Sequence, residues 1–477
     1  MPGSTRSDAG FHGIGCRDLR DRVPGSTGSG AGFHGNHPDR CGWRVPSRFV
    51  HSGGESWARA RGSAASRGGS EVGMRRWGVF AGAVVAVLIA VCGRAQADSW
   101  VPPEQDSFYA VPGDVGAYAP GTVLRSRPST VTFANLPLPV TARQLLYATT
   151  DSHDAPTATV ATVLAPATPW PGPGPRPLLS FQVAEDGVAT SCAPSYALSA
   201  GLAAGLGSAH SDVVSMVTTA LTRGWAVVTP DFEGPQSEFL AGPMAGHGVL
   251  DGIRAALAGG TDGLTPHSPV ALTGYSGGAF ASLWAAELQP AYAPELPLVG
   301  AAVGGMPADL TAVPRDVDGG PFSGFLVGAL IGLDRAYPEA GLRTLLNAHG
   351  AAVIASGDND CVVQMLARYP FLHSAELATT PDPLGTPRAV RLFQRNSLGH
   401  ATPGIPILEY HALGDEVTDV AQADGQLDRY CAAGVAVDRI REPGEHLSGA
   451  MTAMPWIGAY LADRIAGKPA PTNCGTT

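Results

Sequence analysis

The sequence predicts an α/β fold with a mostly parallel central sheet. Short apolar runs with the composition of strands buried on both faces recur along the chain. They lie at residues 177–181, 225–229, 269–273, 298–302 and 406–410. Segments with helical patterning separate them, at residues 211–223, 248–258 and 278–287. Alternating strands and helices are typical of βαβ units, in which the strands are parallel.

An antiparallel part is predicted before the first of these runs. Residues 142–149 and 157–164 are β-prone, and Asp151-Ser152-His153-Asp154 between them is a turn sequence. This pattern predicts a β-hairpin. Another strand-like run, at residues 120–124, precedes the hairpin.

The regular spacing is broken between residues 298 and 407. About a hundred residues separate these two strands, whereas a βαβ unit takes roughly 30. The inserted residues, about 305–400, are apolar and largely helical in pattern, particularly at 322–333, 341–346 and 361–369. We therefore expect a helical subdomain, either a lid over an active site or an insertion without a role in function.

Composition excludes some classes of protein. Of the 477 residues 44% are hydrophobic, enough to bury a core, and 31 basic against 41 acidic residues give a net charge of −10. This balance disfavours nucleic acid as a partner and favours an uncharged or hydrophobic substrate. We expect a monomer.

A targeting segment lies inside the chain. Met74-Arg75-Arg76 precedes an apolar stretch, residues 77–92, which the small-residue exit Ala95-Gln96-Ala97 follows. This is the plan of a signal peptide at residues 74–97, so we expect a secreted domain of residues 98–477 without a membrane span. An uncleaved anchor is the alternative. Residues 1–73 repeat a Gly-, Arg- and Ser-rich sequence, which predicts a disordered or non-native leader and a translation start at Met74.

Four cysteines remain after the signal peptide, and an even number in an exported protein predicts two disulfides. They are Cys192, Cys361, Cys431 and Cys474, and three pairings are open. Because no pair has CxxC spacing and no Gly-rich phosphate loop is present, we expect neither metal nor cofactor.

The strongest chemical motif is Gly274-Tyr275-Ser276-Gly277-Gly278. This is a G-x-S-x-G sequence with a predicted strand before it and a predicted helix after it. That context is typical of a nucleophile elbow, the sharp turn that exposes the nucleophilic serine of an α/β-hydrolase. A serine hydroxyl is a weak nucleophile, so an imidazole and a carboxylate must support it.

The carboxylate is predicted to be Asp415. It lies just after the strand at residues 406–410, and in α/β sheets catalytic groups collect at strand ends. Glu416 and Asp419 in the same turn are rival acids.

The base is predicted to be His446, since the triad order of this fold is Ser, acid, His. His446 is expected in a loop between a last strand, residues 435–440, and a last helix, residues 451–466. His411 is set aside because it precedes the acid.

An oxyanion hole also needs backbone donors, one of them the N–H of Gly277. The second should follow an earlier strand, at residues 180–187. This segment has no HGGG motif, and from its residues alone it is predicted to be a surface turn.

Several motifs occur together in a fixed order. They are residues 181–186 (FQVAED), 192–198 (CAPSYAL), 227–235 (VVTPDFEGP), 249–256 (VLDGIRAA), 274–278 (GYSGG) and 414–417 (GDEV). The set resembles the secretory lipase family of fungi and actinobacteria, over residues 121 to 474. The departures are Asp419, where proline is commoner, and the short tail after Cys474.

This resemblance implies more than the residues alone do. It implies an α/β-hydrolase fold whose insertion is a lid over an acyl-binding tunnel, and it makes Asp186 the oxyanion-hole residue beside Gly277. It also implies the pairings Cys192–Cys361 and Cys431–Cys474. The expected activity is hydrolysis of lipid or other acyl esters. A short-chain esterase, a peptidase and a non-catalytic binding protein are the alternatives.

Overall fold

The computed structural model describes residues 101–201, 208–260, 262–452 and 454–475. The predicted leader, residues 1–73, and the predicted signal peptide, residues 74–97, lie outside these ranges. All features reported below belong to the unit that contains residues 93–477.

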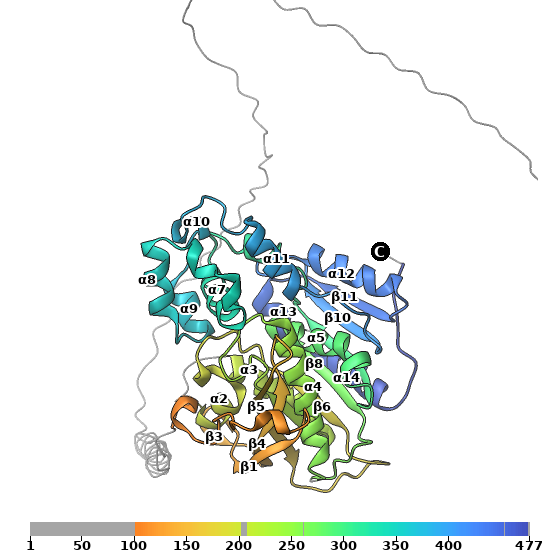
Figure 1. Ribbon diagram of the computed structural model, residues 1–477. Coiled ribbons are helices and arrows are strands. Elements are labelled where there is room, and N and C mark those ends of the chain that lie inside the picture. The colour runs from red at the N-terminus through yellow and green to blue at the C-terminus, as the bar shows by residue number, and fades with distance from the viewer. Residues whose placement is uncertain (1–100, 202–207, 261, 453, 476–477) are drawn as a thin grey trace, which may run out of the picture. The chain divides into compact units, whose positions relative to one another are not determined.

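A nine-stranded sheet forms the centre of the fold, with the order β1-β4-β5-β7-β6-β8-β9-β10-β11 (Figure 1). Its strands are β1 (Val123–Ser129), β4 (Val140–Thr150), β5 (Pro156–Pro166), β6 (Leu178–Gln182), β7 (Ala226–Pro230), β8 (Val270–Tyr275), β9 (Leu298–Gly304), β10 (Ile407–Ala412) and β11 (Val437–Glu442). A separate two-stranded sheet pairs β2 (Thr132–Phe133) with β3 (Leu136–Pro137).

The sheet has an antiparallel part and a parallel part. Strands β1, β4, β5 and β7 pair antiparallel, whereas β7, β6, β8, β9, β10 and β11 pair parallel. The predicted hairpin is confirmed, because Thr150 of β4 pairs with Pro156 of β5. The predicted α/β class with a mostly parallel sheet is also confirmed.

Helices cover both faces of the sheet. They are α2 (Pro194–Ala200), α3 (Ser208–Thr219), α4 (Gly242–Ala258), α5 (Gly277–Tyr292), α12 (Val420–Ala432), α13 (His446–Thr452) and α14 (Met454–Ile465). Neighbouring residues of one strand serve opposite faces: Val270 and Leu272 pack in the core cluster with α4 and α5, and Ala271 packs in the cluster with α3 and α14. This burial on both faces explains the unbroken apolar runs of the sequence.

Helix α4 begins six residues earlier than the expected start at residue 248. Its first turns contain Gly242 and Gly246, which predict helix poorly. A Cβ at Gly242 would lie 2.1 Å from the Trp284 ring, and one at Gly246 would lie 2.6 Å from the Leu288 side chain. The glycines therefore allow α4 to approach α5 closely, and this packing outweighs their low helix propensity.

The insertion between β9 and β10 is helical, as expected, and its helices gather at one end of the molecule in Figure 1. They are α6 (Val313–Asp316), α7 (Gly324–Ala336), α8 (Ala348–Gly357), α9 (Val362–Arg368), α10 (Ser374–Leu377) and α11 (Pro387–Asn396). Residues 341–346 form only a short 3-10 helix, Leu342–Leu345. Helix α11 was not predicted because it is mostly polar, although Ala389, Leu392 and Phe393 are buried.

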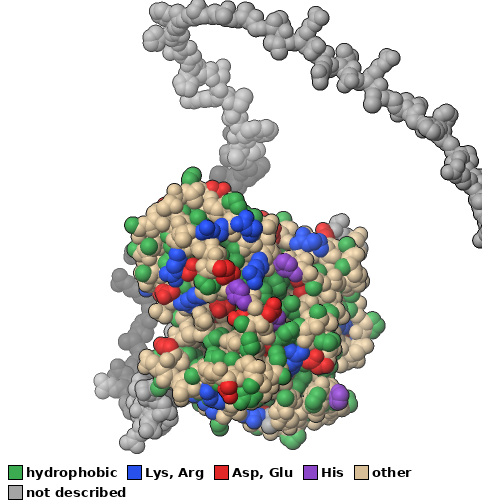
Figure 2. Space-filling model, in the orientation of Figure 1, with side chains coloured by type: hydrophobic (Ala, Val, Ile, Leu, Met, Phe, Trp, Pro, Cys, Tyr) green, Lys and Arg blue, Asp and Glu red, His purple; other side chains and the backbone are tan. Residues whose placement is uncertain are grey.

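Two disulfides tie the fold together. Cys192–Cys361 joins the segment after β6 to the start of α9, and Cys431–Cys474 joins α12 to the C-terminal tail. This is the pairing that the family resemblance implies. In the described part of the chain no helix is both long and apolar enough to cross a membrane. On the face drawn in Figure 2, the described acidic and basic side chains are interspersed.

Candidate active site

Ser276 occupies a sharp turn between β8 and α5. Its φ and ψ are 52° and −120°, and a positive φ of this size is strained for a residue with a side chain. The turn needs glycines on both sides: a Cβ at Gly274 would lie 2.4 Å from the Gly278 carbonyl, and one at Gly278 would lie 2.1 Å from the Gln182 carbonyl oxygen. The predicted strand-turn-helix context of Ser276 is therefore present.

Three predicted residues from three separate segments meet at this turn. The Nε2 atom of His446 lies 3.0 Å from Ser276 Oγ, and its Nδ1 atom lies 2.7 Å from Asp415 Oδ2. Ser276 is only 8% exposed, and His446 and Asp415 are also buried. His446 is the first residue of α13 rather than part of a loop.

The two rival acids make other contacts. The Glu416 carboxylate accepts a hydrogen bond from the backbone N–H of His446, at 3.2 Å. Asp419 caps α12 by accepting from the Ala421 N–H at 2.7 Å. Of the three candidates, Asp415 is the carboxylate bonded to the imidazole of His446.

Asp415 is held as an anion by several donors. Its Oδ1 atom accepts from the backbone N–H groups of Val417, at 3.0 Å, and Thr418, at 2.7 Å. Burial alone would raise the pKa of Asp415, but the hydrogen bonds from His411 and His446 outweigh it and hold this pKa well below its ordinary value.

Tyr275, which the sequence marked only as part of the elbow, contacts His446. Its hydroxyl donates to the backbone carbonyl of His446 at 2.6 Å. Its ring centroid lies 5.2 Å from that of His446 and 5.7 Å from that of Tyr410. The elbow and the start of α13 are therefore fixed to each other.

Asp186 lies on the other side of Ser276. Strand β6 pairs in parallel with β8, Gln182 opposite Gly274, so the segment after β6 passes beside the nucleophile turn. Asp186 has a positive φ of 45° and is 4% exposed, so the surface turn predicted from the residues alone is wrong. A Cβ at Gly277 would lie 1.9 Å from Asp186 Oδ1. The two residues named for an oxyanion hole are thus in contact.

Several carboxyl groups are buried around Asp186. Burial raises the pKa of Asp186 to about 7, although the nearby His446 opposes this. Burial and the charges of Asp231 and Asp186 raise the pKa of Glu185 well above its ordinary value, and burial and the charge of Glu185 do the same to Glu233. Within the described chain, neither Asp186 Oδ1 nor Glu185 Oε2 has a hydrogen-bond partner.

Sequence reasoning missed His411 and Glu409 as parts of this site. Both side chains are fully buried on β10, and His411 Nε2 lies 3.3 Å from Asp415 Oδ2. A signal was available, because charged residues two apart in an otherwise apolar strand point to the same side and need partners when buried.

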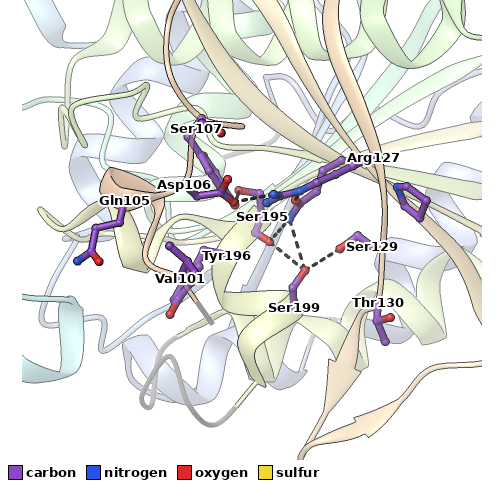
Figure 3. Close-up of a pocket in the computed structure, with 13 residues that line it drawn as sticks. Val101, Gln105, Asp106, Ser107, Arg127, Ser129, Thr130, Ser195, Tyr196 and Ser199 are labelled. Carbon is purple, nitrogen blue, oxygen red and sulfur yellow. Dashed lines mark hydrogen bonds and ion pairs between the residues drawn. The ribbon is translucent and has the colours of Figure 1, made fainter. Parts of the chain in front are cut away.

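A separate hollow of about 570 Å³ lies between residues 101–109, strand β1 and helix α2 (Figure 3). Its polar side chains bond to one another: Arg127 to Asp106 at 2.6 Å, and Ser129 to Ser199 at 2.8 Å. The triad residues do not line it. Among the residues that the structure describes, no cluster of His, Cys, Asp or Glu is arranged to hold a metal ion.

Comparison with known proteins identifies the family of this chain. The model of the family described as secretory lipase matches residues 207–473. A Mycobacterium tuberculosis protein named as a probable inactive lipase is 39% identical over 375 residues, 77% of this chain and 83% of its own. Lipase A of Arthroderma benhamiae is 35% identical, covering 80% of this chain and 83% of its own.

A solved lipase structure is also similar to this chain. The closed state of Candida antarctica lipase A superposes with a TM-score of 0.71 at 32% identity, covering 79% of this chain and 89% of that one. The sheet described above, with the elbow after β8, is accordingly that of an α/β-hydrolase. Since the family model matches more than half of the sequence, this chain belongs to the secretory lipase family of ester hydrolases.

Proposed function

We propose that this chain is a secreted, monomeric lipase or carboxylesterase that cleaves acyl esters through a covalent acyl-enzyme on Ser276. The observation that carries the proposal is the unbroken chain of contacts from Ser276 Oγ to His446, at 3.0 Å, and from His446 to Asp415, at 2.7 Å. This arrangement is the one in which a serine hydroxyl becomes nucleophilic.

The first half of the reaction transfers the acyl group. Ser276 Oγ attacks the ester carbonyl while His446 Nε2 takes the hydroxyl proton. Asp415 holds the imidazole through Nδ1 and stabilises the imidazolium that forms. The tetrahedral intermediate then collapses: His446 returns the proton to the leaving alcohol oxygen, the C–O bond breaks, and an ester of Ser276 remains.

The second half hydrolyses that ester. Water attacks the acyl carbonyl and gives its proton to His446. The second tetrahedral intermediate collapses as His446 returns the proton to Ser276 Oγ, which releases the carboxylic acid.

Gly277 and Asp186 supply the oxyanion hole in this proposal. Gly277 is the first residue of α5, where backbone N–H groups have no partner within the helix and lie at the positive end of its dipole. A negative Asp186 side chain beside the developing oxyanion would oppose catalysis. The raised pKa of Asp186, about 7, favours its neutral form in acidic solution.

The insertion supports a lipid substrate with a medium or long acyl chain. Leu326, Ala329, Leu330 and Leu333 form one stripe of α7 that lines an apolar cavity of about 80 Å³. Leu326 also belongs to a small buried cluster with Val317 and Val417, and Val417 lies two residues after Asp415. We infer that the acyl chain runs from Ser276 along Leu326 into the insertion, which then acts as the lid. The cavity has room for roughly three groups of the size of water, so longer chains must displace side chains.

Three exposed apolar side chains near the triad also support a lipid substrate. Leu413 precedes Asp415 by two residues, Leu447 follows His446, and Met451 lies one helical turn after Leu447. Each is more than half exposed. Apolar side chains next to an active site fit a substrate presented at a lipid–water interface.

The first test of the proposal removes the nucleophile. Ser276→Ala should lower ester hydrolysis by about four orders of magnitude and abolish labelling by a fluorophosphonate. The control is Ser448→Ala, the same serine-to-alanine replacement on helix α13, two residues after His446. Because one relative is named a probable inactive lipase, the measurement of activity is essential. A Ser276→Ala protein that keeps a tenth of wild-type turnover would contradict the assignment.

The substrate is tested with p-nitrophenyl esters of two to sixteen carbons. We expect kcat/KM to rise beyond acetate, because each buried methylene contributes about 0.8 kcal/mol, and to level off once the cavity is full. A steady fall from acetate onward would leave a short-chain esterase. N-terminal sequencing of exported protein tests the signal peptide, with Asp98 as the expected first residue.

A further inference from the structure

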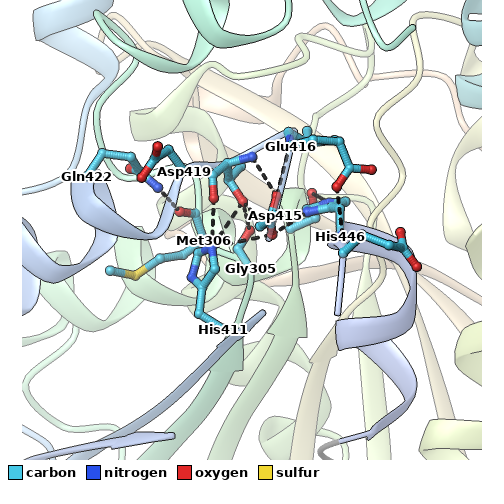
Figure 4. A network of polar contacts seen from close by, with 12 residues as sticks. Gly305, Met306, His411, Asp415, Glu416, Asp419, Gln422 and His446 are labelled. Atoms are coloured by element: carbon cyan, nitrogen blue, oxygen red, sulfur yellow. Dashed lines mark hydrogen bonds and ion pairs between the residues drawn. The ribbon is translucent and has the colours of Figure 1, made fainter. Parts of the chain in front are cut away.

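His411 lies directly behind the catalytic acid, on the side away from His446. Figure 4 shows Asp415 between the two imidazoles. Both contact the same oxygen: His446 Nδ1 lies 2.7 Å and His411 Nε2 lies 3.3 Å from Asp415 Oδ2. The catalytic scheme above uses His446 only, so a second, fully buried imidazole on the same carboxylate calls for a role.

The hydrogen bonds of His411 fix its protonation state. Its Nε2 atom is 2.7 Å from the Thr418 carbonyl oxygen, which can only accept, so Nε2 carries a proton. Its Nδ1 atom is 2.8 Å from Glu409 Oε1. The other oxygen of Glu409 accepts from the Arg441 guanidinium at 2.6 Å, in an ion pair. Nδ1 must therefore donate as well, and His411 is an imidazolium.

The electrostatics of the pocket agree with this geometry. Burial alone would lower the pKa of His411, but hydrogen bonds to Asp415 and Glu409 raise it to about 10. The buried carboxylates Asp415 and Glu409 are thereby balanced by the cations His411 and Arg441. Such pairing is what makes buried charges tolerable.

We propose that His411 is a positioning residue of the triad: it fixes the Asp415 carboxylate from behind and offsets part of its charge, so that His446 remains a base at lower pH. An unbalanced Asp415 would stabilise the imidazolium form of His446 and inactivate the enzyme at higher pH. The inference rests on the proposed function, because it concerns the same triad.

Other charged groups face the two imidazoles and enter the same balance. Those facing His446 are Asp415, Tyr275, Asp186, Glu416 and Glu445, and those facing His411 are Asp415 and Glu409, with Arg441 and Asp424 behind Glu409. Two groups in this set contact Asp415 and can carry a positive charge, namely His446 and His411. Because both imidazoles contact one oxygen, the two contacting nitrogens lie at most about 6 Å apart, and repulsion between unit charges at about 6 Å corresponds to about two pH units at an effective dielectric of about 20.

The test is the pH profile of kcat/KM in His411→Gln, which retains an N–H donor but carries no charge. We expect its acid limb to move up by about one to two pH units, with a smaller effect on the plateau. The matched control is Asp419→Asn at the N-terminal cap of α12, since asparagine caps a helix as well as aspartate does. An acid limb within about 0.3 units of wild type, or a loss of kcat at all pH values without a shift, would overturn the proposal.

A second measurement does not depend on a variant that folds. In ¹⁵N-histidine-labelled wild-type protein at about pH 8, below the raised pKa of His411, both ring nitrogens of His411 should be protonated. A neutral tautomer would overturn the proposal. Failure of this inference is distinguishable from failure of the proposed function. If Ser276→Ala is inactive while His411→Gln keeps the wild-type acid limb, the triad stands and only the role of His411 is refuted.

Discussion

Asp415 and Asp186 lie on either side of Ser276, and their surroundings differ. On the β10 side, Asp415 accepts hydrogen bonds from two backbone N–H groups and contacts two imidazoles, and its pKa is held well below the ordinary value. On the β6 side, burial raises the pKa of Asp186 to about 7, and the carboxyl groups of Glu185 and Glu233 are its neighbours. The same kind of side chain is thus held charged on one side, whereas on the other side burial stabilises its neutral form.

This difference matches what each step of ester hydrolysis needs. In the proposed mechanism, a negative charge behind His446 stabilises the imidazolium that forms during the attack, whereas a negative charge beside the oxyanion would destabilise the intermediate. Environment rather than residue type therefore assigns the two roles. A variant that alters one side of the site therefore tests the role of that side, while the other side stays intact.

The largest effect is expected from Asp415→Asn. The amide has the shape of the carboxylate but cannot stabilise the imidazolium, and it favours the wrong tautomer of His446. We expect kcat to fall by about 10⁴. Steady-state kinetics on a p-nitrophenyl ester measures this.

Glu416→Gln is the matched control for this change. It makes the same acid-to-amide replacement at the next residue, but Glu416 contacts the backbone N–H of His446 and not its imidazole. Its kcat should stay within about tenfold of wild type, because the triad keeps its carboxylate. If Glu416→Gln were the more damaging of the two changes, the acid would have been misassigned.

The two disulfides are expected to contribute differently to the free energy of unfolding. Cys192–Cys361 links the β6 side to the insertion across 169 residues, and Cys431–Cys474 closes only 43. In the chain-entropy model, removing the first should lower the unfolding free energy by about 3 to 5 kcal/mol, and removing the second by about 1 kcal/mol less. Urea unfolding of the two paired Cys→Ser variants gives both values. An equal or larger loss in the variant without Cys431–Cys474 would contradict this loop-length argument.

The β10 side of this comparison was the easier one to predict from sequence. Ser276, Asp415 and His446 follow a fixed order and each comes at the end of a predicted strand, so the sheet itself brings them together. The parallel strands were equally visible, because burial on both faces leaves unbroken apolar runs. The burial of two charged residues on β10 could have been noticed, but the contact of His411 with Asp415 depends on the turn at residues 413–418 folding back over β10.

The β6 side was harder to predict. Residues 184–187 lack a recognised oxyanion motif, and their acidic and glycine residues indicate a solvent-exposed turn. Asp186 packs against the turn at Ser276, and Val188, the next residue after this segment, packs against the insertion; both partners are distant in sequence. The start of α4 was missed for a related reason: its glycines are favoured by close contact with α5 and not by local helix propensity.

Asp186→Asn should change the alkaline part of the pH profile. Above about pH 7 wild-type Asp186 ionises, and its charge then opposes the oxyanion. Asparagine stays neutral, so the ratio of kcat/KM at about pH 9 to that at about pH 6.5 should increase by about tenfold, equivalent to roughly 1.4 kcal/mol. An unchanged ratio would mean that Asp186 does not ionise in the active enzyme or does not face the oxyanion.

The smallest effect concerns the dependence of stability on pH. The pKa of Glu233 is raised in the folded state by burial and by the charge of Glu185, so the native protein retains a proton that the unfolded chain releases above about pH 4.5. This contribution to stability is complete below that pH and is lost as the pH rises toward the folded-state pKa. Glutamine needs no proton, and Glu233→Gln should therefore reduce the fall in unfolding free energy between about pH 5 and about pH 8 by about 1 kcal/mol. Urea titrations at both pH values measure it, with the exposed Glu376→Gln as the control. An unchanged or steeper fall in Glu233→Gln would show that Glu233 is already ionised in the native state over this pH range and that burial does not keep it protonated.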